Sequence, residues 1–185
     1  TIGNIVDDSI DEIDETVIVS LLSPSNATLG TDIVHTYTIN DNENAPSVSF
    51  KNISSSNDES VSSQSIDVNL SSVSSKSITV NYLVTGTATG SGTDHSLANG
   101  TLTISPGEVN GTITIVDIVD DLLDEANETV IVTLSDPSNA ILGSDIVHTY
   151  TINDNDNLPF IDFNIISSEG DESSSSITIT VDVSE

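Results

Sequence analysis

Carboxylate side chains are concentrated in one short segment of this sequence, residues 120–128. The segment reads Asp-Asp-Leu-Leu-Asp-Glu-Ala-Asn-Glu, so five carboxylates fall within nine residues. Carboxylates this close repel one another by about 1 kcal/mol per pair at 4 Å, even in water. Calcium would relieve the repulsion, because it takes six to eight oxygen ligands at about 2.3–2.6 Å in flexible geometry. A solvated acidic surface is the alternative interpretation of the segment taken alone.

The whole chain shares this acidity. It has 30 acidic residues against two basic ones, Lys51 and Lys76, which gives a formal charge of −28 over 185 residues. Such a chain cannot displace counterions from a nucleic-acid backbone, and it cannot dock on an anionic membrane surface. No apolar run approaches the roughly 20 residues that span a bilayer, so we expect no membrane insertion in this segment. The expected partners are cations.

The remaining composition favours strands. The hydrophobic fraction is 35%, and it consists mainly of Ile, Val and Leu among many Ser and Thr residues. Such β-branched residues favour strands, so we expect a folded chain once its charge is neutralised. Because the chain has no cysteine, disulfides and thiolate metal sites are excluded. The first residues lack the features of a signal peptide, and an extracellular, cell-surface location is inferred from composition.

An internal repeat organises the chain. Residues 1–46 align without a gap on 114–159, a shift of 113, with 33 of the 46 positions identical. We therefore expect the second half of one repeat at 1–45, one complete repeat at 46–157, and the start of a third at 158–185. The simplest explanation is that this sequence is part of a longer array of such repeats.

Strand and turn signals alternate within the complete repeat. Turns are expected at Asn99-Gly100, Pro106-Gly107 and Asn110-Gly111. No window shows an apolar stripe at helical spacing. About seven strands in ~110 residues predict an all-β, immunoglobulin-like antiparallel sandwich. The runs with the clearest strand pattern are 66–70, 78–82, 101–104, 112–115, 130–134 and 149–152.

Several motifs occur in a fixed order along the repeat. In sequence they are Val48-Ser49-Phe50, Thr87-Ala88-Thr89, Gly92-Thr93-Asp94-His95, residues 102–108, residues 120–128 and residues 152–156. Together they resemble the Calx-beta family, calcium-binding modules found in sodium–calcium exchangers and in many large bacterial surface proteins. The resemblance covers 47–157 and both flanking fragments. It implies tandem Calx-beta sandwiches.

The resemblance also implies a set of calcium ligands. In the family, calcium lies at one end of the sandwich, among the interstrand loops and a final acidic triplet. Matched motif by motif, the ligands fall on Glu59, Asp94, Asp120, Asp121, the carbonyl of Leu123, Glu125, Glu128, Asp154, Asn155 and Asp156. In the partial first copy the corresponding residues are Asp7, Asp8, Glu12, Glu15, Asp41 and Glu43.

Two residues depart from the family pattern. His95 stands where a tyrosine is usual, and Asn155 replaces an acid found in the strongest sites. An amide can coordinate through its oxygen, but it lowers the charge of the site. His35 and His148 occupy the same repeat position, and we expect plain strand residues there rather than a transition-metal site. We expect His95 to pack in the place of the tyrosine.

These patterns predict a calcium-rigidified structural repeat of a long extracellular adhesin or surface filament, without enzymatic activity. The expected partners are calcium ions and neighbouring repeats, with other copies in a filament or a surface glycan or protein ligand as further possibilities. A cadherin-like array is an alternative, because 40–46 and 153–159 resemble cadherin linkers. An accessory module of a secreted hydrolase is another. A regulatory calcium sensor suits near-identical tandem copies less well.

Overall fold

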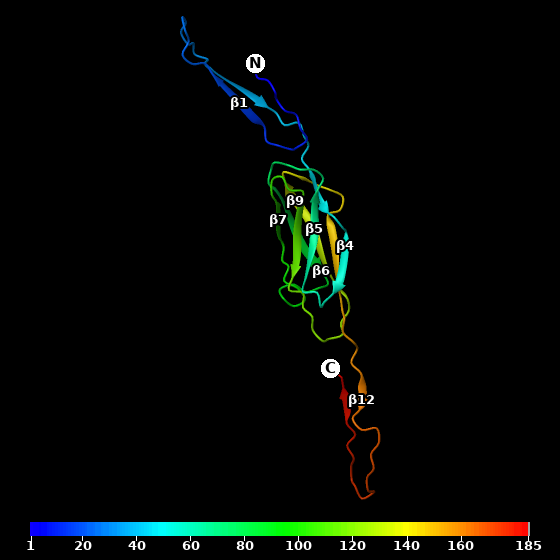
Figure 1. Cartoon of the computed structure of the whole chain (residues 1–185). Helices are drawn as coiled ribbons and strands as arrows, with labels where there is room; N and C mark the ends of the chain where they lie inside the picture. The colour runs from blue at the N-terminus through cyan, green and yellow to red at the C-terminus, as the bar shows by residue number, and fades with distance from the viewer. Residues whose placement is uncertain (185) are drawn as a thin grey trace.

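The chain forms three parts that follow one another along a long axis (Figure 1). The computed structural model describes residues 1–184. A β-sandwich spanning residues 47–153 occupies the middle. A hairpin from the first residues lies at one end, and a hairpin from the last residues lies at the other. Among the described residues, no helix has the length and apolar character needed to cross a membrane.

The sandwich has two sheets. In spatial order, one sheet contains β10 (Ile141–Leu142), β3 (Ser47–Phe50), β5 (Ser63–Leu70) and β8 (Asn110–Val116). The other contains β4 (Ser54–Asp58), β11 (Val147–Asn153), β9 (Glu128–Ser138), β6 (Ile78–Gly86) and β7 (Gly100–Ile104). Neighbouring strands are antiparallel, except that β10 runs parallel to β3 and β4 runs parallel to β11.

The core lies between the two sheets and follows from the alternation of side chains. In β5, Ile66 and Val68 are buried while the residues between them are not. In β9, Val130 and Val132 alternate in the same way, and Tyr150 of β11 is fully buried among them. Each such aliphatic side chain contributes about 1.5–3 kcal/mol on burial. The apolar residues therefore fill the middle and leave the two ends of the sandwich to polar loops.

The predicted all-β sandwich is confirmed, with differences in detail. The structure has nine strands in the sandwich because β4 and β10 add to the predicted set. β4 reads Ser-Ser-Ser-Asn-Asp and is held by pairing with β11. The turn predicted at Asn110-Gly111 is wrong, since β8 begins at Asn110. Gly111 is needed for packing instead, because a Cβ atom there would lie 2.9 Å from Cγ1 of Ile104.

The two terminal hairpins repeat the strand register of the sandwich. In β1 (Glu15–Ser20) and β2 (Val34–Ile39), Val17 pairs with Tyr37, and 113 residues later Val130 pairs with Tyr150. In β12 (Ile161–Phe163) and β13 (Val181–Val183), the pairs equal those of β3 with β5 under the same shift. This agreement supports the predicted repeat boundaries, which stay a prediction.

Candidate metal centre

Four segments meet at one end of the sandwich, which we call the acidic end. Because β4 and β11 run parallel with Asp58 opposite Asn153, both strands finish at the same end. Glu59 follows β4, and its N–H donates to the carbonyl of Asn153 at 3.0 Å. The other segments are the β6–β7 connection with Asp94, the acidic loop of residues 120–128 that leads into β9, and residues 154–156 after β11.

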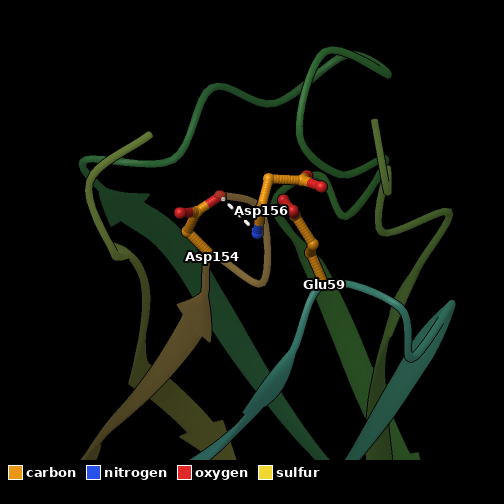
Figure 2. A group of neighbouring side chains, drawn as sticks. All are labelled: Glu59, Asp154 and Asp156. Carbon is orange, nitrogen blue, oxygen red and sulfur yellow. Dashed lines mark hydrogen bonds between the residues drawn. The ribbon is translucent and has the colours of Figure 1, made fainter. Parts of the chain in front are cut away.

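The tightest group at this end consists of Glu59, Asp154 and Asp156. One carboxylate oxygen from each lies within 4.8 Å of the others, and Figure 2 shows the three side chains drawn together above the strand ends. Glu59 is only 7% exposed. Oδ2 of Asp156 is buried and has no hydrogen-bond partner among the described residues. Three uncompensated carboxylates supply the oxygen donors that a hard divalent cation takes.

Neither basic side chain of the protein neutralises this group. Nζ of Lys51 lies 3.3 Å from Oδ2 of Asp67, and Nζ of Lys76 lies 2.8 Å from Oδ1 of Asp11. The sequence contains no other lysine and no arginine. The acidic end therefore depends on protons or on added cations for charge compensation.

Burial and mutual repulsion favour the protonated forms of two carboxylates at the acidic end. Burial, together with the neighbouring Asp156 and Asp154, raises the pKa of Glu59 to about 7. Burial also raises the pKa of Glu128, and Asp94 and then Glu125 act in the same direction. A cation placed among these groups would reverse both effects, because it stabilises the ionised carboxylates.

A cavity of about 250 Å³ opens between the loops of the acidic end. Its volume is several times the ~30 Å³ that one water occupies in the liquid, so it has room for an ion with bound water. Uncharged atoms of Thr93, Val119, Ala126 and Ile152 complete its wall. Seven of the predicted ligands line it: Glu59, Asp94, Asp121, Leu123, Glu125, Glu128 and Asp154.

The remaining three predicted ligands, Asp120, Asn155 and Asp156, are connected to the cavity through Glu59. Asp156 belongs to the tight group with Glu59. Asn155 bridges two carboxylates, since its Nδ2 donates to Oδ1 of Asp120 at 2.9 Å and to Oε1 of Glu59 at 3.4 Å. The structure thus brings together all ten residues predicted in the complete repeat. Their role as calcium ligands stays a prediction, and Asn155 presents its nitrogen rather than its oxygen to the group.

One residue that sequence reasoning missed is Asn127. Its Oδ1 accepts a hydrogen bond from the N–H of Asp154 at 3.1 Å, and its Nδ2 donates to Oδ1 of Asn153 at 3.3 Å. It therefore ties the acidic loop to the segment after β11. The first copy repeats the contact, with Oδ1 of Asp14 accepting from the N–H of Asp41 at 3.0 Å. The sequence did offer a signal, because Asp14 and Asn127 occupy the same repeat position and both carry a side-chain oxygen that can accept a hydrogen bond.

The predicted residues of the first copy also meet. All six line one small cavity of about 60 Å³ beside the β1–β2 hairpin: Asp7, Asp8, Glu12, Glu15, Asp41 and Glu43. Burial raises the pKa of Glu43, and the adjacent Asp41 raises it further.

Two of the three histidines, His95 and His148, are buried in the sandwich, whereas His35 of β2 is exposed. His95 is buried, its Nδ1 accepts from the N–H of Leu97 at 3.1 Å, and burial lowers its pKa. His148 is buried in β11, with Nε2 2.9 Å from Oγ of Ser55. Both were expected to be structural residues, and their surroundings agree.

Comparison with known proteins gives the same family as the motifs. The Calx-beta domain matches residues 41–156. The crystal structure of the apo form of the Calx CBD1 domain superposes with a TM-score of 0.54 at 26% identity, over 60% of this chain and 98% of that one. The calcium binding domain CBD12 of CALX1.1 gives 0.53 at 27%, over 59% of this chain and 44% of that one. CBD12 from CALX1.2 gives 0.54 at 23%, over 64% and 48%.

A search of curated proteins finds no match. The match to the Calx-beta domain covers more than half of the chain and includes every predicted ligand of the complete repeat. The chain belongs to the Calx-beta family of calcium-binding domains.

Proposed function

We propose that the acidic end of the sandwich binds calcium. The observation that carries this proposal is the group of Glu59, Asp154 and Asp156, whose oxygens lie within 4.8 Å of one another with no basic side chain to compensate them. The donor set fits the ion, because calcium prefers carboxylate, carbonyl and water oxygens in flexible arrangements. Buried, unpaired Oδ2 of Asp156 is an atom that such an ion would satisfy.

The acidic end offers more donors than the tight group alone. Beside Glu59, Asp154 and Asp156, the cavity is lined by Asp94, Asp121, Glu125 and Glu128. Bound calcium supplies the positive charge that this end lacks. The protein's part is to hold the loops in place, through Asn127 between the acidic loop and Asp154, and through Asn155 between Asp120 and Glu59.

We infer that the domain serves as a calcium-rigidified repeat of a long extracellular adhesin or surface filament. The support is the place of residues 154–156, directly before the connection to the next hairpin (Figure 1). An ion there would join the loops of one repeat to the segment that leaves it. The identical registers of the flanking hairpins support a tandem array. Such a repeat needs no catalytic group, and other copies or a surface ligand are its further proposed partners.

The alternatives differ in what they require. A cadherin-like array would also bind calcium at the connections, but the match over residues 41–156 favours Calx-beta. A regulatory calcium sensor is compatible with the similarity to CBD12 structures. An accessory module of a secreted hydrolase would place the chemistry outside these residues. Turnover of a polysaccharide by this chain itself would instead contradict a non-catalytic role.

Thermal melting of the 185-residue chain tests calcium binding. At calcium 100-fold above its Kd, a folded-state ligand stabilises by about 2.7 kcal/mol, which raises Tm by several degrees. The double substitution of Asp154→Asn and Asp156→Asn should abolish most of this shift. Glu108→Gln removes one charge from an exposed loop at the other end of the sandwich and should preserve it. An equal Tm in calcium and in chelator would refute the proposal.

A further inference from the structure

A buried aspartate joins the first hairpin to the sandwich. Asp11 is 3% exposed, although it belongs to a loop that is otherwise mostly exposed. Its Oδ2 accepts from Oγ of Ser74 at 2.6 Å, its Oδ1 accepts from Nζ of Lys76 at 2.8 Å, and its carbonyl accepts from the N–H of Ser75 at 2.9 Å. One three-residue stretch, Ser74–Lys76, therefore binds Asp11. We call this stretch the docking segment, and we call its contact with Asp11 the first joint.

Asp124 occupies the same repeat position 113 residues later, and it is exposed. The loop around it has the same turn as the first copy: the N–H of Leu123 donates to Oδ1 of Asp121 at 2.7 Å, as the N–H of Ile10 does to Asp8 at 2.8 Å. Asp124 lines an open, largely apolar pocket of about 470 Å³ together with Leu122, Leu123, Asn157, Pro159 and Ser184.

The far wall of this pocket repeats the structure that precedes the docking segment. Ser184 corresponds to Ser71 under the shift of 113. Oγ of Ser184 accepts from the N–H of Phe160 at 2.8 Å, as Oγ of Ser71 does from Ser47 at 2.9 Å. The N–H of each serine donates back to the carbonyl of the same partner at 2.9 Å. In the sandwich, the docking segment begins three residues after Ser71.

We propose that the pocket beside Asp124 is the docking site for the Ser-Ser-Lys segment of a following repeat, with Asp124 in the role of Asp11. Both walls of the first joint recur at this pocket, and the first joint shows which segment lies between such walls. By analogy with Asp11, the site suits a segment that offers one hydroxyl, one backbone N–H and one ammonium group. This inference rests on the tandem array proposed above.

Such a joint at every boundary would arrange the repeats head to tail. Each acidic loop presents an aspartate at one end of its repeat, and each docking segment presents a lysine at the other end. Lys76 is one of only two Lys or Arg residues in the chain, so few other basic side chains could pair with Asp124. The acidic end of one repeat is therefore matched to the docking end of the next and not to another acidic end.

The test uses the whole chain, lengthened after residue 185 by a second copy of residues 73–158 so that a following repeat is complete. The readout is amide hydrogen exchange at Ser75 and at its duplicate. Asp11→Asn should speed exchange of Ser75 alone by about tenfold, the value of one charge-assisted hydrogen bond. Asp124→Asn should do the same to the duplicate alone. In the chain without the extension, Asp124→Asn should leave exchange at Ser75 unchanged. Asp32→Asn, on the remote side of the first hairpin, should change exchange in neither chain.

Swapping the two charges of the proposed ion pair distinguishes a lost contact from a variant that merely unfolds. Asp124→Lys combined with aspartate at the duplicate of Lys76 should restore protection that Asp124→Lys alone removes. If the duplicate repeat keeps protected core amides while Asp124→Asn leaves its joint amide unchanged, the docking site is refuted. Calcium titration of the same samples separates the two proposals, because loss of calcium binding with an intact joint would refute only the calcium site.

Discussion

The side-chain nitrogen of Asn155 lies 2.9 Å from Oδ1 of Asp120 and donates a hydrogen bond to it. The same nitrogen reaches Oε1 of Glu59 at 3.4 Å. A neutral amide thus links carboxylates from two loops that would otherwise repel one another. These hydrogen bonds stabilise the acidic end when no cation is bound. A carboxylate in place of the Asn155 amide would add a negative charge there.

Replacing this amide by a carboxylate should change stability in opposite directions with and without calcium. In chelator, Asn155→Asp should lower the free energy of unfolding by about 1 kcal/mol or more, because it exchanges two hydrogen bonds for repulsion. With calcium, the added charge should tighten binding by roughly three- to tenfold. Calorimetric titration and melting in parallel measure both. Asn155→Ala, which removes the bridge without adding charge, should weaken binding; tighter binding by that variant would contradict the argument.

Calcium affinity should depend on pH through Glu59. Its pKa is raised from 4.5 to about 7, so in the ion-free fold it contributes stability below pH 4.5 that is lost as pH rises through 7. Calcium requires the ionised form, and its affinity should therefore fall by up to about tenfold per pH unit below 7. Titrations between pH 5 and 8 measure this slope. Glu59→Gln should flatten it, and an equally steep slope in that variant would assign the proton to another group, such as Glu128.

Asn127 should act as a positioning residue. Its amide joins Asp154 to the acidic loop, so Asn127→Ala should lower calcium affinity by about tenfold, the value of one to two hydrogen bonds. The number of bound ions should not change. Asn127→Asp keeps the acceptor that Asp14 provides in the first copy and should bind within a few-fold of the wild type. Asn52→Ala, at an exposed position, is the matched control; equal losses in Asn127→Ala and Asn52→Ala would remove Asn127 from the site.

The sequence predicts the strands whose apolar residues alternate, and it predicts less well where pairing alone creates structure. Ile66 and Val68 alternate with polar residues, and their strand is where it was expected. Ser54–Asp58 has no apolar residue, so nothing local identifies it, yet its parallel pairing with β11 brings Glu59 to Asp156. The ligand set follows from spacing and family motifs. The orientation of the Asn155 amide depends on two loops from distant parts of the chain.

The contact between Asp11 and the docking segment shows the same limit of prediction from sequence. Asp11 and Asp124 look alike in the sequence, as two more carboxylates in acidic loops, and neither was among the predicted ligands. Only the contact with Ser74 and Lys76, more than 60 residues away, separates a buried aspartate from an exposed one. Such a contact depends on how two parts of the chain meet, which periodicity does not encode.

Gly86 should be intolerant of any side chain, because it lies where the β6–β7 connection meets the start of β9. Its φ is +132°, and a Cβ atom would lie 2.0 Å from the carbonyl oxygen of Thr129. That carbonyl accepts from the N–H of Ala88 at 3.0 Å and so holds the loop carrying Asp94 against Glu128. Gly86→Ala should cost about 2–4 kcal/mol of unfolding free energy and weaken calcium binding. Gly107→Ala, with φ of +84° and open space, should cost only about 1 kcal/mol. Denaturant titration compares them, and equal costs would show that the contact with Thr129 is not what requires glycine.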